Sequence, residues 1–268
     1  MKKFIFFTFL LFYLARIFAQ LEIVAETEVS ADFFTIDKFG NFYFVKGDKI
    51  IKTDKNFDTI AEFSDKSKGN IGSIDALDPF RLMIFYPQFN SIVFLDKVFN
   101  QLRSTIFLDD IEYFSVAAVC SSNFGSFRIF NNNCNCIQLI DNNLRIMQRS
   151  SSLNFLSFNV KITKILEIND HVLAFDDTGN IYIFDIFGTF ISVFNDVKAK
   201  DIVSYRNTFI ILDNQNYIYI FNPSDKGKHE IQKIAELKNI KEITSFAIHE
   251  NQVFILSDKR LIIFRFEN

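Results

Sequence analysis

Asn180-Ile181-Tyr182-Ile183-Phe184-Asp185 is the stretch that decides the fold. Its β-branched and aromatic residues predict a strand, and the final aspartate is expected to cap a turn with its side chain. The same pattern recurs along the chain: a small or polar residue, Ile or Leu, three mostly apolar residues and usually Asp. The other runs begin at Lys49, Ser91, Cys136, Tyr217 and Arg260.

The spacing of these runs identifies a long repeat. The second residues of successive runs are 42, 45, 44, 37 and 43 positions apart. A period near forty, made only of strand-like segments, is typical of a β-propeller blade. No helix-period run and no linker rich in Pro, Gly or Ser interrupts the series, so the sequence predicts an all-β fold.

Each unit of the repeat divides into four short strands separated by polar turns. The unit at 162–194 shows this best, because Asn169-Asp170-His171 and Asp176-Asp177-Thr178-Gly179 separate its first three strands. Several strands are apolar on both faces, as expected for a sheet sandwiched between two neighbours. The other units run over 33–63, 72–108, 114–148, 201–237 and 243–266.

The last unit lacks a fourth strand because the sequence ends there. Leu21-Glu22-Ile23-Val24-Ala25-Glu26 precedes the first unit and has no other partner. We expect this segment to complete the sixth blade, since closure of the ring buries strand edges. The prediction is therefore a six-bladed β-propeller forming a single domain over 20–268. A β-sandwich and two smaller β-domains are the rival architectures.

Residues 1–19 have the pattern of a secretory signal peptide. A basic start is followed by an apolar run at 4–14 and by Ala19, where we expect cleavage. The run is shorter than the about 20 residues that span a bilayer, so we expect no integral membrane span after signal removal. The alternative is an uncleaved N-terminal anchor. We predict an exported protein, periplasmic or secreted in a bacterium.

Composition and motifs argue against several classes of function. The 268 residues are 49% hydrophobic with a formal net charge of −3, which excludes a disordered chain and disfavours a nucleic-acid binder. The histidines lack metal-ligand spacing, and no nucleophile elbow, phosphate-binding loop or dinucleotide fingerprint occurs. We therefore expect no enzyme activity, no catalytic residue, no metal and no cofactor.

The chain contains three cysteines, Cys120, Cys134 and Cys136. An exported protein can oxidise them, but a bridge between Cys134 and Cys136 would be strained by its shortness. The predicted strand register places Cys120 about 15 Å from both, beyond the about 7 Å that a disulfide spans. We expect thiols without a role; a different register would allow Cys120 to form a bridge.

Two loops depart from the repeat and contain apolar residues. The turn at 85–90 replaces a polar turn, and the connector at 150–161 is unusually long. In a propeller, turns between second and third strands lie on the same face as blade connectors, so these loops are expected to form one partner-binding surface. The alternative is that the connector packs its apolar residues under the disc. The candidate partner-binding residues are Tyr86, Gln88, Phe89, Leu153, Phe155 and Phe158.

The segments at 177–185 and 37–43 share an Asp, Gly-Asn, Tyr pattern followed by apolar residues. This pattern resembles that of six-bladed propellers of the NHL and YVTN/WD40-like kind, and the resemblance covers 21–268. The Gly-His and Trp-Asp signatures of true WD40 repeats are absent. The resemblance implies a rigid disc with binding sites on its faces, and it implies no particular activity.

These observations favour a non-catalytic, exported propeller that acts as a protein–protein interaction scaffold in the cell envelope. Its expected partners are envelope proteins. The first alternative is a small-molecule or glycan binder, which predicts a deep polar pocket in the central channel. The second is a metal-dependent propeller lactonase or lyase. Lactonases that resemble this fold hold a metal with carboxylates and Asn from several blades, a set that the sequence does not identify.

Overall fold

Six separate four-stranded antiparallel sheets make up the computed structural model, which describes residues 21–111, 115–156 and 160–266. Blade 1 contains β2 (Phe33–Ile36), β3 (Phe42–Lys46), β4 (Lys49–Thr53) and β5 (Thr59–Ser64). Blade 2 contains β6 (Ser73–Asp75), β7 (Leu82–Tyr86), β8 (Ser91–Leu95) and β9 (Ile106–Phe107). Blade 3 contains β10 (Val116–Ser121), β11 (Phe127–Asn131), β12 (Cys136–Ile140) and β13 (Ile146–Arg149).

The second half of the chain repeats this arrangement. Blade 4 contains β14 (Ile162–Ile168), β15 (His171–Asp176), β16 (Ile181–Asp185) and β17 (Phe190–Phe194). Blade 5 contains β18 (Ala199–Tyr205), β19 (Thr208–Asp213), β20 (Tyr217–Asn222) and β21 (Glu230–Glu236). Blade 6 contains β22 (Ile243–His249), β23 (Gln252–Ser257), β24 (Arg260–Phe266) and β1 (Leu21–Glu28).

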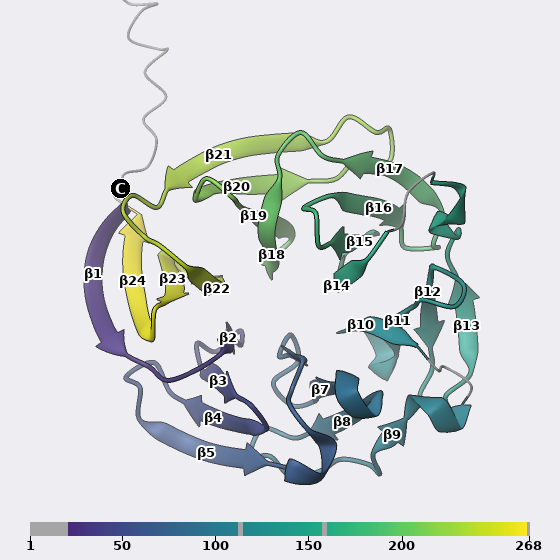
Figure 1. Ribbon diagram of the computed structural model, residues 1–268, viewed down its shortest axis with the longest axis horizontal. Helices are drawn as coiled ribbons and strands as arrows, with labels where there is room; N and C mark the ends of the chain where they lie inside the picture. The colour runs from purple at the N-terminus through teal and green to yellow at the C-terminus, as the bar shows by residue number, and fades with distance from the viewer. Residues whose placement is uncertain (1–20, 112–114, 157–159, 267–268) are drawn as a thin grey trace, which may run out of the picture.

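The six sheets form a ring in chain order, with the first strand of each blade near the centre and the last at the rim (Figure 1). This confirms the prediction of a six-bladed β-propeller. The strand β1 pairs antiparallel with β24, from Leu21 opposite Phe266 to Glu28 opposite Arg260. The N-terminal strand therefore closes the last blade, as the orphan segment of the sequence predicted.

The core lies between neighbouring blades rather than within one of them. Tyr43 and Ile50 of blade 1 belong to the same buried cluster as Leu82 of blade 2. Across the closure, the ring of Phe42 in blade 1 meets Phe254 in blade 6 edge to face, with centroids 5.1 Å apart. Because each sheet is covered on both sides, its strands are apolar on both faces. Each fully buried apolar side chain contributes about 1.5–3 kcal/mol to the free energy of folding.

Aspartates at strand ends fix the turns. Asp96, directly after β8, accepts hydrogen bonds from the backbone N–H groups of Val98 and Asn100, at 2.9 and 2.8 Å. Asp54 and Asp141 hold the equivalent turns of blades 1 and 3 in the same way. This confirms the predicted capping role of the aspartate that follows the third strand.

Cysteine pairing differs from the expectation. Cys134 and Cys136 form a disulfide, with Cα atoms 5.2 Å apart, whereas the sequence predicted free thiols. Asn135 between them adopts a left-handed conformation with φ of 50°, which turns the chain tightly enough to bring the two sulfur atoms together. Cys120 is buried in β10 and has a free thiol, so the structure contains no bridge from it.

Candidate functional site

The two faces of the disc differ in the turns that form them. Because neighbouring strands are antiparallel, turns between first and second strands lie at the same blade edge as turns between third and fourth strands. We call this edge the first face; the opposite edge, with the remaining turns and the blade connectors, is the second face. On the first face of blade 3, the Asn142 side-chain amide lies 3.4 Å from the Phe124 carbonyl oxygen. On the second face, the backbone N–H of Asn70 donates to the Gln88 side chain at 3.2 Å.

Two of the predicted partner-binding residues belong to the core. Tyr86 and Leu153 are both 0% exposed, although each lies beside an exposed segment of chain. Tyr86 ends β7 and packs into the cluster between blades 1 and 2, while Leu153 packs into the cluster between blades 3 and 4. Neighbouring blades cover both side chains, so neither of them is accessible at the surface of this structure.

Three other predicted residues, Gln88, Phe89 and Phe155, are exposed but do not form one surface. Phe89 is 50% exposed in the turn of blade 2, and Phe155 is 60% exposed in the connector after blade 3. Phe155 packs edge to face on Phe190 of blade 4, with ring centroids 5.1 Å apart. Phe89 and Phe155 lie on opposite sides of blade 3, because the blade 2 turn carries Phe89 and the connector after blade 3 carries Phe155 (Figure 1). Gln88 is exposed beside Phe89, and Phe158 lies outside the described residues.

Exposed apolar side chains gather instead on the first face of blades 1–3. We call Phe39, Leu77, Phe80 and Phe124 the apolar patch. The rings of Phe39 and Phe80 meet edge to face at 6.1 Å, which joins blade 1 to blade 2. Phe124 of blade 3 is 98% exposed, and it lines a cleft together with Leu77 of blade 2. The patch therefore has residues on three neighbouring blades, with one contact between blades 1 and 2 and one shared cleft between blades 2 and 3.

Aspartates fix the backbone beneath the patch. The N–H group of Phe39 donates to the Asp37 carboxylate at 2.8 Å. In blade 2, the N–H groups of Leu77 and Phe80 donate to Asp75 and Asp78, both at 3.0 Å. Each of these apolar residues thus stands two positions after an aspartate that binds its backbone. The sequence signal was present as Asp-x-Phe and Asp-x-Leu in turns, but nothing in one sequence shows that such side chains point outward.

A cleft of about 380 Å³ opens beside the patch. It is lined by residues at or next to the turns between the first and second strands of blades 2, 3 and 4. Leu77 and Phe124 form its apolar part, and Arg81, Ser122 and Glu167 form its polar part. The Arg81 guanidinium lies over the Phe94 ring at 3.9 Å and donates to the Gly125 carbonyl oxygen. Burial, together with nearby Arg103, lowers the pKa of Arg81, but a guanidinium remains charged at neutral pH.

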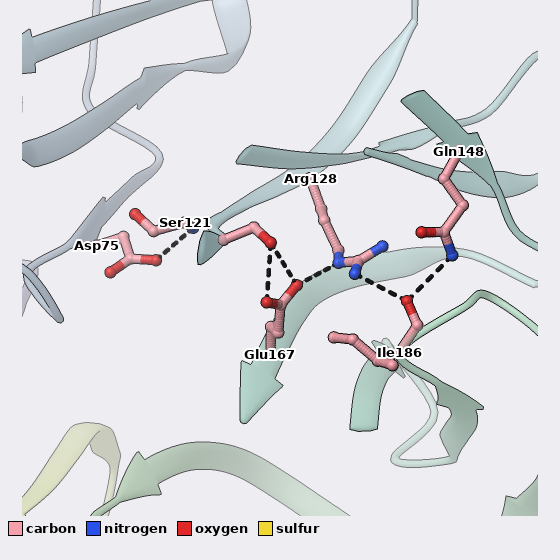
Figure 2. Close-up of polar contacts among 7 residues, drawn as sticks. Asp75, Ser121, Arg128, Gln148, Glu167 and Ile186 are labelled. Carbon is pink, nitrogen blue, oxygen red and sulfur yellow. Dashed lines mark hydrogen bonds and ion pairs between the residues drawn. The ribbon is translucent and has the colours of Figure 1, made fainter. Parts of the chain in front are cut away.

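Beneath the cleft, a buried ion pair joins blade 3 to blade 4 (Figure 2). The Arg128 and Glu167 side chains are 3% and 5% exposed, and the Arg128 Nε donates to the Glu167 carboxylate. The Ser122 hydroxyl lies 2.8 Å from both carboxylate oxygens. Arg128 and Gln148 also donate to the Ile186 carbonyl oxygen, at 3.1 and 3.0 Å. Because both charged groups have several hydrogen-bond partners, the pair fixes blades 3 and 4 relative to each other.

A second junction holds blade 2 against blade 3. The backbone N–H of Ser121 donates to the Asp75 carboxylate at 2.7 Å, so one aspartate both supports Leu77 and ties β6 to β10 (Figure 2). The turns of blades 2 and 3 that carry Leu77, Phe80 and Phe124 therefore follow strands that are tied to the neighbouring blades. A surface that is fixed before binding loses little conformational entropy when a partner docks.

The first face of blades 4 and 5 has a different character. A groove of about 690 Å³ runs between the turns at 186–189 and 225–227, and its walls include Asp170, Asp185 and Asp225. The exposed Phe187 stands at its edge. His171 lies 2.9 Å from Asp225 across the groove. Within the three described ranges, no group of His, Cys, Asp or Glu side chains is arranged to hold a metal ion.

Comparison with known proteins gives the fold and no closer relationship. No protein-family model and no curated protein matches the chain. Among solved structures, the chain is similar to the WD40 domain of Pan2 from Neurospora crassa, with a TM-score of 0.61, 8% identity, and 92% and 96% of the two chains covered. It is also similar to a streptogramin B lyase, with a TM-score of 0.60, 13% identity, and 87% and 78% covered.

A third similar structure is BamB from Moraxella catarrhalis, with a TM-score of 0.50, 15% identity, and 88% and 69% of the two chains covered. Together these structures confirm the resemblance to WD40-like and NHL-like propellers at the level of the fold. They include a lyase and a WD40 domain, so the fold by itself does not distinguish an enzyme from a binding module.

Proposed function

We propose that the protein is a non-catalytic interaction scaffold, exported to the cell envelope, that binds a partner protein through the apolar patch. The observation that carries this proposal is the exposure of Phe39, Leu77, Phe80 and Phe124 on turns of one face. The Phe39 and Phe80 rings touch, and Leu77 and Phe124 line one cleft. Exposed aromatic side chains that lie close together mark protein–protein surfaces more often than chance, and buried aromatics supply much of the energy at such interfaces.

Charges around the patch indicate the chemistry of the partner. The Lys38 ammonium lies 5.4 Å from the centre of the Phe39 ring, and the Lys97 ammonium lies 5.9 Å from the centre of the Phe80 ring. Arg81 lines the adjoining cleft together with Asp78 and Glu167, and the Glu167 carboxylate is paired with Arg128. A partner segment with an apolar anchor flanked by carboxylates fits this arrangement, because charge complementarity fixes register and speeds association.

Export rests on the sequence pattern of residues 1–19. In the described part of the chain, no helix is both long and apolar enough to cross a membrane. Cell fractionation combined with the intact mass of the purified protein tests export. We expect a mature chain that begins at Gln20 and is found outside the cytoplasm. A cytoplasmic chain that retains Met1 would contradict this part of the proposal.

Crosslinking in intact cells, followed by mass spectrometry, tests the binding face. The test variant combines Phe39→Asp, Phe80→Asp and Phe124→Asp. The control combines Phe89→Asp and Phe155→Asp, which adds two negative charges, against three in the test variant, to exposed phenylalanines of the second face. Circular dichroism and denaturation midpoints establish that both variants remain folded.

We expect one defined partner to be crosslinked to the wild type and to the control, and to be lost from the test variant. Loss from the control with retention in the test variant would instead support the surface predicted from the sequence at Gln88, Phe89 and Phe155. Absence of any partner from the wild type would contradict the scaffold proposal. Ligand screening against the cleft beside Arg81 would then be the next experiment.

A further inference from the structure

A disulfide lies in the turn between β11 and β12 on the second face of blade 3. It joins Cys134 to Cys136 and encloses a single intervening residue, Asn135. Stabilisation by a disulfide through chain entropy grows with the length of the loop that it closes. A loop this short gives the bond little to contribute to the fold, and it links neither two blades nor the two ends of the ring. Its chemistry is therefore a better guide to its role than its effect on stability.

The two cysteines differ in their access to solvent. Cys134 is partly exposed at the tip of the turn, whereas Cys136 is buried at the start of β12. An incoming thiolate therefore reaches the sulfur of Cys134 more easily than that of Cys136. With one accessible and one protected sulfur in the same turn, the accessible cysteine is the one that reacts with an incoming thiol. The protected cysteine is then the one that displaces that thiol from the mixed disulfide.

The surrounding backbone holds the two cysteines in place independently of the bond between them. Cys136 is paired with Asn131 in the ladder between β11 and β12. The Ser152 hydroxyl donates to the Cys134 carbonyl oxygen at 2.7 Å, and the N–H of Leu153 donates to the Asn135 carbonyl oxygen at 2.8 Å. After reduction, the two thiols stay adjacent, so that ring closure remains an intramolecular step with a high effective concentration.

We propose that Cys134 and Cys136 form a thiol–disulfide exchange site, in which Cys134 forms a mixed disulfide with a partner thiol and Cys136 resolves it. This inference does not depend on the apolar patch or on the identity of the protein bound there. The substrate class is a thiol or a disulfide, of a small molecule or of a protein, that reaches the second face of blade 3.

The exchange balances without any further reactant. A partner thiolate attacks the Cys134 sulfur; the bond between Cys134 and Cys136 breaks, and its electron pair leaves on the Cys136 sulfur, which takes a proton from water. A second partner thiolate attacks the partner sulfur of the mixed disulfide, which releases the oxidised partner and the Cys134 thiolate. The pair is thereby reduced by two electrons and two partner thiols are oxidised. In the reverse direction, the reduced pair converts a partner disulfide to thiols.

Glutathione is a suitable probe, and the buried thiol of Cys120 is an internal control. Burial, with a smaller effect of nearby Asp75 and Glu167, raises the pKa of Cys120 and keeps its sulfur unreactive. The variants Cys136→Ser and Cys134→Ser are treated with oxidised glutathione, and adducts are located by mass spectrometry. We expect Cys136→Ser to accumulate an adduct on Cys134 at least about tenfold faster than Cys134→Ser accumulates one on Cys136.

The wild type provides a second measurement that does not depend on the folding of either variant. Its disulfide is reduced by glutathione in buffer and in denaturing urea, and free thiols are counted by alkylation. We expect reduction of the native disulfide at a rate within about tenfold of the unfolded rate. Equal reactivity of the two variants, three free thiols (Cys120 included) in the reduced wild type after exposure to oxidised glutathione, or a native disulfide that resists reduction would each overturn the proposal.

Discussion

Blades 1–3 and blades 4–6 contain the same four-stranded sheet but have different first turns. The innermost strands of blades 1–3 have 4, 3 and 6 residues, whereas those of blades 4–6 all have 7. The turns that follow are correspondingly long in the first half, at 37–41, 76–81 and 122–126. In the second half they are two-residue hairpins at 169–170, 206–207 and 250–251.

The two halves differ in the length and conformation of the turns that follow their first strands. The short turns begin with Asn169, Arg206 and Glu250, all with positive φ, as tight hairpins require. Two-residue turns offer fewer outward positions than the longer turns of the first half. The longer turns of blades 1 and 2 are held by Asp37, Asp75 and Asp78 and present Phe39, Leu77 and Phe80, on the half of the ring that we propose as the binding face.

The largest expected effect lies at the boundary between the two halves. Arg128→Met leaves the Glu167 carboxylate buried without its cation, and we expect a loss of about 3–5 kcal/mol in the free energy of unfolding. The double variant Arg128→Met, Glu167→Leu removes both charges and is expected to recover most of that loss. Denaturant unfolding measures both variants. A loss below about 1 kcal/mol for the single variant would show that the pair does not join the halves.

The next effect compares the same turn motif in the two halves. Asp37 in blade 1 and Asp176 in blade 4 each accept a hydrogen bond from a tyrosine hydroxyl, Tyr43 and Tyr182, at 2.9 Å. Replacement of either aspartate by alanine leaves a buried hydroxyl without its acceptor, at an expected cost of about 2–3 kcal/mol.

Only the aspartate in the first half supports the patch. We therefore expect Asp37→Ala to weaken partner crosslinking because it releases the backbone of Phe39, whereas Asp176→Ala leaves crosslinking unchanged. Equal loss of crosslinking in both variants would mean that stability, rather than the position of the patch, determines binding.

A smaller effect concerns acid stability in the second half. Burial raises the pKa of Asp176, but hydrogen bonds from Asn180, Thr178 and Tyr182 outweigh burial and lower it below the usual 3.8. A carboxyl whose pKa is lower in the folded state stabilises that state above the unfolded pKa. This contribution is lost as the pH falls through the folded pKa. We expect Asp176→Asn to flatten the acid limb of a stability–pH curve below about pH 4. An unchanged acid limb would contradict the role given to these hydrogen bonds.

The smallest expected effect on stability belongs to the most exposed residue of the patch. Phe124→Asp should change the free energy of unfolding by no more than about 0.5 kcal/mol, because its ring is almost entirely in solvent. The same substitution should abolish crosslinking to the partner. Phe187→Asp, on the first face of blade 4, is the matched control and should leave crosslinking intact.

The repeat could be predicted from the sequence because it depends on local rules. Strand-forming residues and capping aspartates recur near every fortieth position, and the orphan segment at 21–26 had only one free sheet edge to pair with. Each of these features is decided by neighbours in the chain or by the need to close the ring. The closure by β1 and the division into blades follow directly.

The candidate site could not be predicted in the same way, because burial depends on neighbouring blades. Tyr86 and Leu153 lie in loop-like sequence, yet adjacent blades cover them completely. Phe39 and Phe124 have no periodic signal, and their exposure depends on where a turn points. The disulfide was missed because the left-handed conformation of Asn135 is invisible in composition and spacing.

Site-specific photocrosslinking tests the central claim most directly. A photoreactive amino acid replaces Phe124 on the first face of blade 3, Phe187 on the first face of blade 4, or Phe89 on the second face, each in otherwise wild-type protein. We predict that irradiation of intact cells yields a discrete protein adduct from position 124 and none from positions 187 and 89. An adduct from 187 or 89, with none from 124, would contradict the assignment of the binding face to blades 1–3.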